Sequence, residues 1–414
     1  MSGTVHIIGA GVAGLAAAVR LARGPHKLAV YEAAPQAGGR CRSYYDSSLG
    51  MMIDNGNHLL LSGNRHALSF LSAIGSEGQL RGPPEAEFAF ADLVSGDWWQ
   101  LRPNPSPVPW WIFSSQRRVP GTNARDYLGL FRLVTSRRDL PLEIVLRRRG
   151  PAYERLWQPF FLAALNTPPA LASSHLAAAI IRETLAKGGR ACRPLIAAHG
   201  LSAAFVDPAL AFLSERGVDV RFGHRLRAIA FDAGRASNLD FGAEKIRLAP
   251  ADQVILAVAP FNAREIVPGL RAPENYHAII NAHYKIAPPG NLPPILGIIN
   301  ATIEWLFAFP DRLSVTISFA DRLIDVPREE LAAKIWEEVA EATKIDMPLP
   351  PWQIVKERRA TFAATPAENA RRPKTRTDFD NLLLAGDWTA TGLPATIEGA
   401  IRSGHRAADE IAAN

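Results

Sequence analysis

The sequence predicts an α/β fold in two domains, and three observations lead to this prediction. The chain has 414 residues, which is too long for one ordinary domain and comfortable for two. A short apolar run near the N-terminus, Thr4–Ile8, ends in a glycine-rich turn that opens into an alanine-rich stretch. A second short apolar run, Leu382–Ala385, ends in Gly-Asp near the C-terminus. Because ligands bind at the carboxyl ends of parallel strands, we expect both ends of the chain to serve one site.

The N-terminal run leads into the motif GAGVAG, which is typical of a Rossmann-type dinucleotide-binding unit. Gly9 permits the tight turn out of the strand, and Gly11 lacks a Cβ, so that a pyrophosphate can approach the backbone. Gly14 lets the following helix, expected over about 14–23, pack closely on the sheet. The free N–H groups and partial positive charge at the start of that helix favour a phosphate.

A second strand, Leu28–Tyr31, completes the unit and ends at Glu32. An acid at this distance from the glycine motif accepts hydrogen bonds from ribose hydroxyls, and its charge disfavours the 2′-phosphate of NADP. The pair Gly38 and Gly39 with Arg40 follows, which suits a second backbone approach to the phosphates beside a guanidinium. This triplet favours FAD over NAD. The alternative is a glycine-rich turn without a ligand.

The C-terminal segment is expected to close the cofactor site from the other side. Gly386 and Asp387 follow the last strand, and Asp387 is a candidate to hold ribityl or phosphate-side hydroxyls. Pro394 suits the first turn of a helix. The start of that helix, with Thr396 and Ile397, could face the flavin pyrimidine ring, where its dipole would stabilise a reduced anion. The alternative is a plain surface helix that ends the chain.

Three blocks together resemble the large flavoprotein family of monoamine oxidases, protoporphyrinogen oxidases and phytoene-desaturase-like enzymes. The blocks are GAGVAG with Glu32, AGGR, and LAGDWTATGLPATIEGAIRSG. The resemblance implies FAD, and non-covalent FAD because the C-terminal block has no cysteine. In such enzymes the strand within Gly217–Ile229 touches the adenine side, here near Val220.

This resemblance implies a monoamine-oxidase-like architecture, with a discontinuous Rossmann-type FAD-binding domain and a mixed α+β substrate-binding domain. The FAD-binding domain is expected over 1–80, 199–265 and 375–414. The substrate-binding domain is expected over 81–198 and 266–374, with strands at Asn275–Ile286, Glu304–Pro310 and Ser314–Phe319 and helices at Arg328–Thr343 and Ser174–Lys187.

The segment Ile53–Arg65 is the expected edge of the reaction site. In related oxidases the corresponding chain passes under the flavin, and the next residues line the substrate cavity, which implies this role for Asn57, His58 and Leu59. His58 is our candidate proton donor, with Asn57 beside it, and the alternative for His58 is a locally bonded histidine. Asp54 is expected to be a structural acid bonded to backbone.

The marks of amine oxidases are missing from this chain. Trp388–Ile397 lacks the second tyrosine of their aromatic pair, and Ile279–Asn281 lacks the lysine that approaches the flavin. Instead, DNGNHLLLSGN, Leu156–His175 and His199–Leu210 resemble the hydroxysqualene dehydroxylases of bacterial hopanoid synthesis. That resemblance implies a hydrophobic isoprenoid substrate, hydroxysqualene, whose allylic carbon accepts a hydride from the reduced flavin N5 to give squalene. The alternatives are a carotenoid or polyprenoid desaturase and a non-catalytic flavin-containing scaffold.

The electron donor must come from outside this chain, because only one dinucleotide motif is present. NADPH or a partner reductase would reload the flavin. Two distant cysteines, Cys41 and Cys192, predict no disulfide framework and no metal site, and they favour a cytoplasmic setting. No apolar run is long enough to span a membrane, no signal precedes the first strand, and no nucleic-acid motif occurs.

A lipid-facing segment is expected at Trp98–Pro120, which carries four tryptophans among prolines. The chain from Arg117 to Arg149 has nine arginines against three acids, an excess that would favour anionic lipid at the cytoplasmic face of the inner membrane. The arginines are Arg117, Arg118, Arg125, Arg132, Arg137, Arg138, Arg147, Arg148 and Arg149. The alternative is a buried aromatic cluster beside a solvated basic helix.

Overall fold

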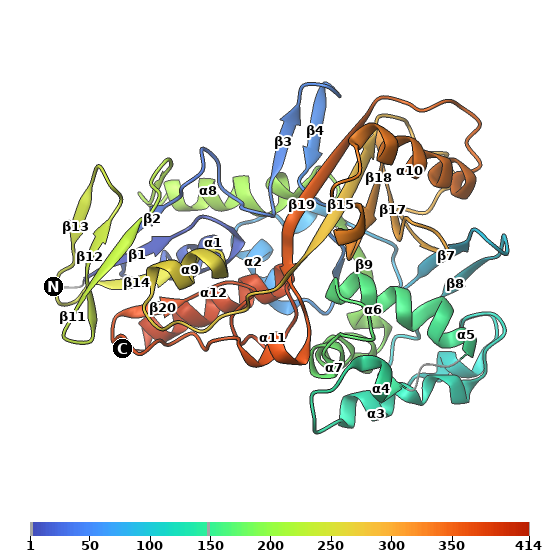
Figure 1. Ribbon diagram of the computed structural model, residues 1–414, viewed down its shortest axis with the longest axis horizontal. Helices are drawn as coiled ribbons and strands as arrows, with labels where there is room; N and C mark the ends of the chain where they lie inside the picture. Colours follow the sequence, from blue (N-terminus) through green and yellow to red (C-terminus); the bar gives the residue numbers. More distant parts are fainter. Residues whose placement is uncertain (1–2, 147–149, 414) are drawn as a thin grey trace.

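A computed structural model describes residues 3–146 and 150–413 and shows two sheets at opposite ends of the molecule (Figure 1). The first is a parallel five-stranded sheet of order β10-β2-β1-β14-β20. Its strands are β1 (Thr4–Ile8), β2 (Lys27–Tyr31), β10 (Val220–Arg221), β14 (Gln253–Leu256) and β20 (Leu382–Leu384). The sheet therefore joins both ends of the chain, as the sequence predicts.

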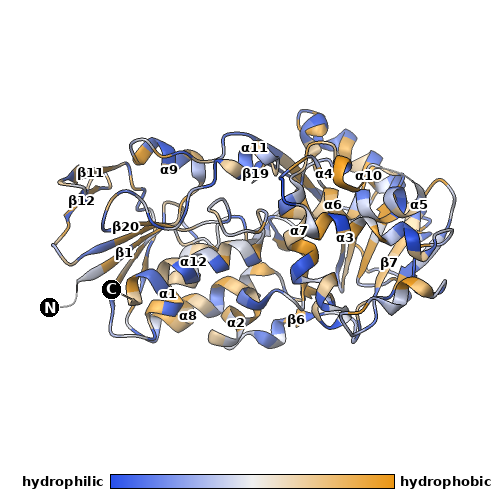
Figure 2. Ribbon diagram, turned by 90° about the horizontal axis from the view of Figure 1, so that it is seen from below, coloured by the Kyte–Doolittle hydropathy of each residue, from blue (hydrophilic) through white to orange (hydrophobic). Residues whose placement is uncertain are grey.

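Four helices cover one face of this sheet, which Figure 2 shows below β1 and β20. They are α1 (Val12–Leu21), α2 (Arg65–Ala73), α8 (Asp207–Ser214) and α12 (Ile397–Ala412). Their apolar side chains form one core with the sheet, with Ile7 and Leu15 fully buried. The opposite side carries α9 (Pro260–Ile266) and a three-stranded antiparallel sheet of β11 (Ala228–Asp232), β12 (Arg235–Asp240) and β13 (Lys245–Arg247).

The second large sheet has seven strands in the order β19-β15-β18-β17-β16-β7-β8. They are β7 (Phe88–Asp92), β8 (Trp98–Leu101), β15 (Tyr276–Tyr284), β16 (Ile295–Ile299), β17 (Trp305–Phe309), β18 (Arg312–Ile317) and β19 (Trp352–Phe362). Helix α10 (Arg328–Thr343) packs on one face of the sheet, where Ile335 and Val339 are buried against the strands.

The other face of this sheet packs against a group of short helices that we call the helical lobe, residues 102–146 and 150–192. It contains α3 (Gly129–Thr135), α4 (Leu142–Leu146), α5 (Gly150–Ala152), α6 (Gln158–Leu165) and α7 (Ser174–Glu183). It also has the 3-10 turns η2 (Trp110–Phe113), η3 (Ala124–Tyr127), η5 (Leu185–Lys187) and η6 (Gly189–Ala191) and the π-helical turn η4 (Tyr153–Trp157). The lobe lies at the end of the molecule away from the parallel sheet (Figure 1).

The remaining elements of the described residues are short. They are β3 (Ser43–Asp46), β4 (Met51–Asp54), β5 (Leu60–Leu61), η1 (Glu77–Gln79), β6 (Leu80–Arg81), β9 (Pro194–Ala197), η7 (Ser202–Val206), η8 (Ala320–Leu323) and α11 (Pro366–Ala370). Strand β9 pairs with both β5 and β6. All strands of the parallel sheet fall inside the ranges predicted for the FAD-binding domain, although the exact domain borders stay a prediction.

Several element boundaries differ from the sequence prediction. Helix α1 begins at Val12 instead of Gly14, because Gly11 with extended backbone is its N-cap. Helix α7 ends at Glu183, and non-helical Thr184 separates it from a 3-10 turn. Pro394 lies outside any helix, since α12 begins only at Ile397, so its predicted place in a first helical turn was wrong.

Candidate active site

The glycine turn after β1 has the geometry of a phosphate-binding loop. Gly9 has φ +105°, which only glycine adopts readily, and a Cβ on Gly14 would lie 1.9 Å from the Gly9 carbonyl oxygen. A Cβ on Gly11, by contrast, would meet no protein atom within 4 Å. No side chain caps the N-terminus of α1, so its N–H groups face that open space. This arrangement fits the pyrophosphate of a dinucleotide.

The second glycine pair lies directly against the first loop. The Gly38 N–H donates to the Ala10 carbonyl at 2.8 Å, and Gly11 and Gly38 form a parallel β-bridge. Gly39 has φ +57°, and a Cβ placed there would approach only the Gly11 Cα, at 3.5 Å. Two glycine segments therefore border one space, as the sequence predicts for two backbone approaches to the phosphates.

Glu32 at the end of β2 is tied to the same turn. Its carboxylate accepts the Ala10 N–H and the Ala34 N–H, both at 2.8 Å. A carboxylate has lone pairs for further bonds, so a ribose contact stays compatible with this geometry. Val220 lies in the two-residue strand β10 and pairs with Val30 of the neighbouring strand β2. This is the side of the sheet where we predict the adenine.

Arg40 and Asp387 are brought together from opposite ends of the chain. One guanidinium nitrogen of Arg40 lies 2.8 Å from each oxygen of Asp387, and another donates to the Ala360 carbonyl at 2.5 Å. The Asp387 carboxylate raises the pKa of Arg40. Buried Arg372 donates to the backbone carbonyl of Asp387 at 3.0 Å and so stabilises the turn that carries Asp387. Asp387 is thus an anchor for Arg40, and its predicted contact with cofactor hydroxyls stays a prediction.

Hydrogen bonds fix the start of α12 and join the helix to the end of β20. The Thr396 hydroxyl accepts the Gly399 N–H at 3.0 Å as an N-cap, so Thr396 and Ile397 lie at the helix N-terminus as predicted. The Ser403 hydroxyl accepts the Gly386 N–H at 2.7 Å and joins the helix to the end of β20. Trp388 is fully buried and donates to the Val258 carbonyl at 2.9 Å. The turn that we expect beside the flavin is therefore rigidly held.

Asp54 is a structural acid, which confirms the prediction. One carboxylate oxygen accepts the Ser43 hydroxyl at 2.6 Å and the Leu201 N–H at 2.8 Å. The other oxygen lies 3.6 Å from a guanidinium nitrogen of Arg312. Burial raises the pKa of this carboxyl, and these hydrogen bonds oppose the shift. The acid fixes the start of the segment that leads to Asn57 and His58.

Asn57 is held by a polar network that the sequence analysis did not find. Its amide nitrogen donates to the Thr316 hydroxyl at 3.1 Å, and its carbonyl oxygen accepts the Ser314 hydroxyl at 2.8 Å. Asn281 accepts the Thr316 hydroxyl at 2.8 Å and contacts the same segment. The alternation of Ser314 and Thr316 with apolar Leu313, Val315 and Ile317 in β18 was the available signal.

His58 follows Asn57 and makes no hydrogen bond within residues 3–146 and 150–413, so the locally bonded alternative finds no support there. Burial and the nearby Arg40 charge lower its pKa to about 4. The imidazole is therefore neutral at neutral pH, where a neutral ring donates a proton less readily than an imidazolium. Its role as proton donor stays a prediction.

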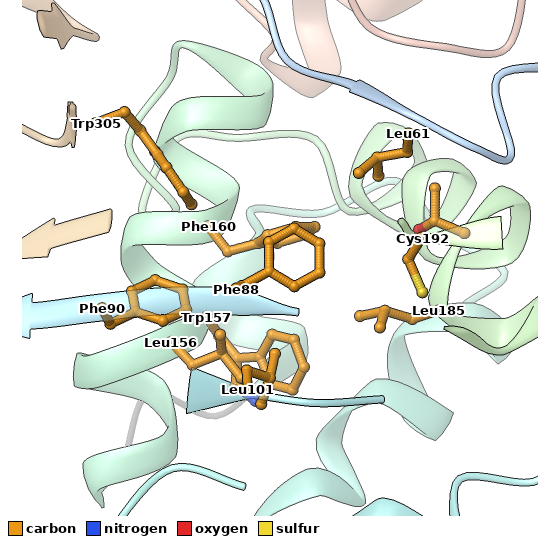
Figure 3. Close-up of a pocket in the computed structure, with 11 residues that line it drawn as sticks. Leu61, Phe88, Phe90, Leu101, Leu156, Trp157, Phe160, Leu185, Cys192 and Trp305 are labelled. Carbon is orange, nitrogen blue, oxygen red and sulfur yellow. The ribbon is translucent and has the colours of Figure 1, made fainter. Parts of the chain in front are cut away.

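An apolar cavity begins where this segment reaches Leu61 (Figure 3). The space that the centre of a water molecule can occupy inside it is about 20 Å³, so its side chains must move apart before it admits a larger ligand. The lining residues are Leu61, Phe88, Phe90, Leu101, Leu156, Trp157, Phe160, Thr184, Leu185, Cys192 and Trp305. In Figure 3 the rings of Phe88 and Phe160 face Leu185 and Cys192 across the cavity. Asn57, His58 and Leu59 are not among these lining residues, Leu59 packs on the surrounding core, and their predicted place along a substrate cavity stays a prediction.

Cys41 and Cys192 are both free and buried, and burial raises the pKa of Cys192 to about 12. Both thiols are therefore protonated at neutral pH and poorly nucleophilic.

Comparisons with known proteins place this geometry in a family. A model of the flavin-containing amine oxidoreductases matches residues 12–412. A protein of Rhodopseudomonas palustris named hydroxysqualene dehydroxylase is 54% identical over 100% of this chain and 99% of its own length. One of the same name from Sinorhizobium fredii is 52% identical over 99% of this chain and 98% of its length. The solved structure of a putrescine oxidase superposes with a TM-score of 0.73 at 18% identity, covering 100% of both chains, which shows a shared two-domain fold.

Proposed function

Because the chain belongs to the flavin-containing amine oxidoreductases, in the group of the hydroxysqualene dehydroxylases, we propose that it reductively removes the allylic hydroxyl of hydroxysqualene and yields squalene. It is an FAD-dependent oxidoreductase. The observation that carries the proposal is the apolar cavity that begins at Leu61, a few residues after Asn57 and His58. A hydrocarbon chain fits such a lining because apolar contacts stabilise it.

The reaction balances as follows. The allylic alcohol takes up two electrons and two protons, the C–O bond breaks, a C–H bond forms, and water leaves. FAD, when bound and reduced, supplies the hydride to the allylic carbon. An external reductant, NADPH or a partner reductase, must restore the two electrons after each turnover.

The residues of this chain bind the substrate, orient it and control water. The aromatic wall of Trp157, Phe160 and Phe88 would hold the isoprenoid chain and present π faces to allylic positive charge. Asn57, fixed by Ser314 and Thr316, keeps the neighbouring backbone in one position. His58, which is our candidate to give the departing hydroxyl a proton, stands on this fixed segment.

An anaerobic single-turnover experiment tests the proposal. The purified flavoprotein is reduced with dithionite and mixed with hydroxysqualene in detergent micelles, and flavin absorbance and extracted lipids are followed together. We expect flavin reoxidation with a matching amount of squalene. A flavin that stays reduced while the alcohol is untouched would overturn the proposal, and oxidised enzyme that adds double bonds to a polyprene would replace it with desaturation.

A matched pair of variants tests whether the substrate binds in the cavity. Leu185→Trp fills the space between Leu185 and Phe160, and we expect it to raise KM at least tenfold at unchanged FAD content. Leu349→Trp, at a partly exposed position outside the cavity lining, should leave KM unchanged. Equal KM values in the two variants would show that the substrate binds elsewhere.

A further inference from the structure

We propose that the outer face of the helical lobe is a docking surface for an anionic lipid bilayer. Several large apolar side chains of the lobe point into solvent, with Phe131 71%, Trp110 64% and Ile144 63% exposed. We call the full set the apolar ridge: Val108, Trp110, Phe113, Leu128, Phe131, Leu140, Ile144 and Leu171. Single exposed apolar side chains are ordinary, whereas eight on one small lobe are not.

The ridge residues come from neighbouring pieces of the lobe. Trp110 and Phe113 are three positions apart, and their ring centroids lie 6.2 Å apart. The start of α4 is hydrogen-bonded to the loop that carries Leu171, through the Leu142 N–H and the Ala172 carbonyl at 2.8 Å. Helices α3 and α4 pack together, and a Cβ on Gly129 would lie 3.5 Å from the Leu146 carbonyl.

Basic side chains without acidic partners accompany the ridge. Arg125, Arg132, Arg137 and Arg138 are exposed, and none forms an ion pair with the described residues. The three acids of this stretch, Asp126 (which is exposed), Asp139 and Glu143, each have an interaction partner within the chain. Asp126 accepts the Asn123 N–H at 2.7 Å, and Asp139 accepts the Ser173 hydroxyl and the Asn369 amide. Arg147, Arg148 and Arg149 lie outside the described residues.

The structure also corrects the lipid-facing segment expected from the sequence. Trp99 and Trp111 are buried, while Trp98 and Trp110 are exposed, so only half of the tryptophans in Trp98–Pro120 face solvent. Of the buried pair, Trp99 stacks on Phe90 of β7, and Trp111 begins an aromatic path toward the cavity. Trp111 lies edge-on to Tyr127 at 5.0 Å between centroids, and Tyr127 lies 6.0 Å from Trp157 in the cavity wall.

An apolar ridge flanked by unpaired arginines matches the interface of an anionic bilayer better than that of a soluble partner. Tryptophan and phenylalanine enter the acyl boundary, and each arginine near the surface contributes about fivefold to partitioning. The same lobe forms the wall of the substrate cavity, so docking would bring the cavity next to dissolved isoprenoid. Only this last step, which takes the isoprenoid in the bilayer to be the substrate, rests on the proposed function.

Vesicle flotation without substrate tests the docking. The holoenzyme is mixed with vesicles of phosphatidylcholine alone or with phosphatidylglycerol. We expect binding to the anionic vesicles only. Phe131→Ser with Ile144→Ser, and separately Arg132→Glu with Arg138→Glu, should each lower the partition coefficient at least about tenfold. Met347→Ser with Leu349→Ser, partly exposed outside the lobe, is the matched control and should bind normally.

Three outcomes would overturn this proposal. They are absence of wild-type binding, equal binding by the ridge variants, and ridge-dependent dimerisation in sedimentation that leaves no free surface for lipid. Turnover separates the proposal from the proposed function. The ridge variants should convert substrate normally in micelles and slowly from vesicles. An enzyme that docks but converts no hydroxysqualene in micelles would refute the reaction and leave the docking surface intact.

Discussion

Gly11 offers a direct test of the cofactor site, because its Cβ position is empty of protein. Gly11→Ala adds one methyl group that meets no protein atom within 4 Å. The Gly11 backbone, with φ −69° and ψ 171°, is allowed for alanine. Losing glycine at a helix N-cap costs about 0.5–1 kcal/mol, and the less flexible unfolded chain offsets about 0.4–1 kcal/mol. The folded apoprotein should therefore keep its stability within about 0.5 kcal/mol.

FAD affinity should respond very differently. A methyl group at this position stands where the pyrophosphate would meet the uncapped start of α1. Displacement from the helix N-terminus should remove one charge-assisted hydrogen bond and part of the dipole interaction, a loss of about 2–4 kcal/mol. The dissociation constant of FAD would then rise about 30- to 1000-fold.

The assay pairs urea unfolding of the apoproteins with titration of FAD followed by flavin absorbance. Gly78→Ala is the matched control, because Gly78 is exposed in η1 and a Cβ there also meets no atom within 4 Å. Wild-type FAD affinity in Gly11→Ala would refute the placement of the pyrophosphate. Loss of FAD together with a large loss of apoprotein stability would refute the claim that the space is free.

Three further predictions concern stability and pH. Gly404→Ala puts a Cβ 2.1 Å from the Ala13 carbonyl between α12 and α1, so urea unfolding should show a loss of about 1–3 kcal/mol, and an unchanged midpoint would contradict this packing. If His58 is the proton donor, its pKa of about 4 means that kcat/KM falls about tenfold per pH unit above that value. His58→Gln should abolish that slope, and a flat wild-type profile would exclude the role. Burial raises the pKa of Glu304 to about 7 from 4.5, so the folded state binds the extra proton between these values. The free energy of unfolding should therefore fall by up to about 3 kcal/mol as pH rises from 4.5 to 7, and Glu304→Gln should remove the dependence.

The sequence predicted those parts of the site that depend on short spacing. Gly9, Gly11 and Gly14 each have the environment that the motif requires, because a strand, a turn and a helix within a few residues leave little freedom. The start of α12 near Thr396 and Ile397 was found for the same reason. Pro394 was misplaced because proline is equally acceptable in the turn that precedes a helix.

Contacts between distant segments could not be predicted from one sequence. Arg40 and Asp387 were both chosen as cofactor residues, yet nothing in the sequence says that they pair across 347 positions. The network of Asn57 with Ser314 and Thr316 likewise depends on how β18 passes the 54–58 segment. The alternation of exposed and buried tryptophans in Trp98–Pro120 follows from the packing of Trp99 on Phe90 and of Trp111 on Tyr127, which composition does not encode.

The electrostatics of the site also bear on which of the family's reactions this chain catalyses. Amine oxidation would bring a charged or freshly neutralised amine into the cavity, and the residues that line it carry no carboxylate. A buried ammonium without a partner costs several kcal/mol, so the lining disfavours amines. His58 is neutral, and Ile279–Asn281, the stretch in which the family resemblance would place a lysine, has none. An alcohol with a long hydrocarbon chain loses little free energy of hydration on entering the same cavity. The missing amine-oxidase residues and the apolar lining therefore point to the same substrate class by independent physical reasons.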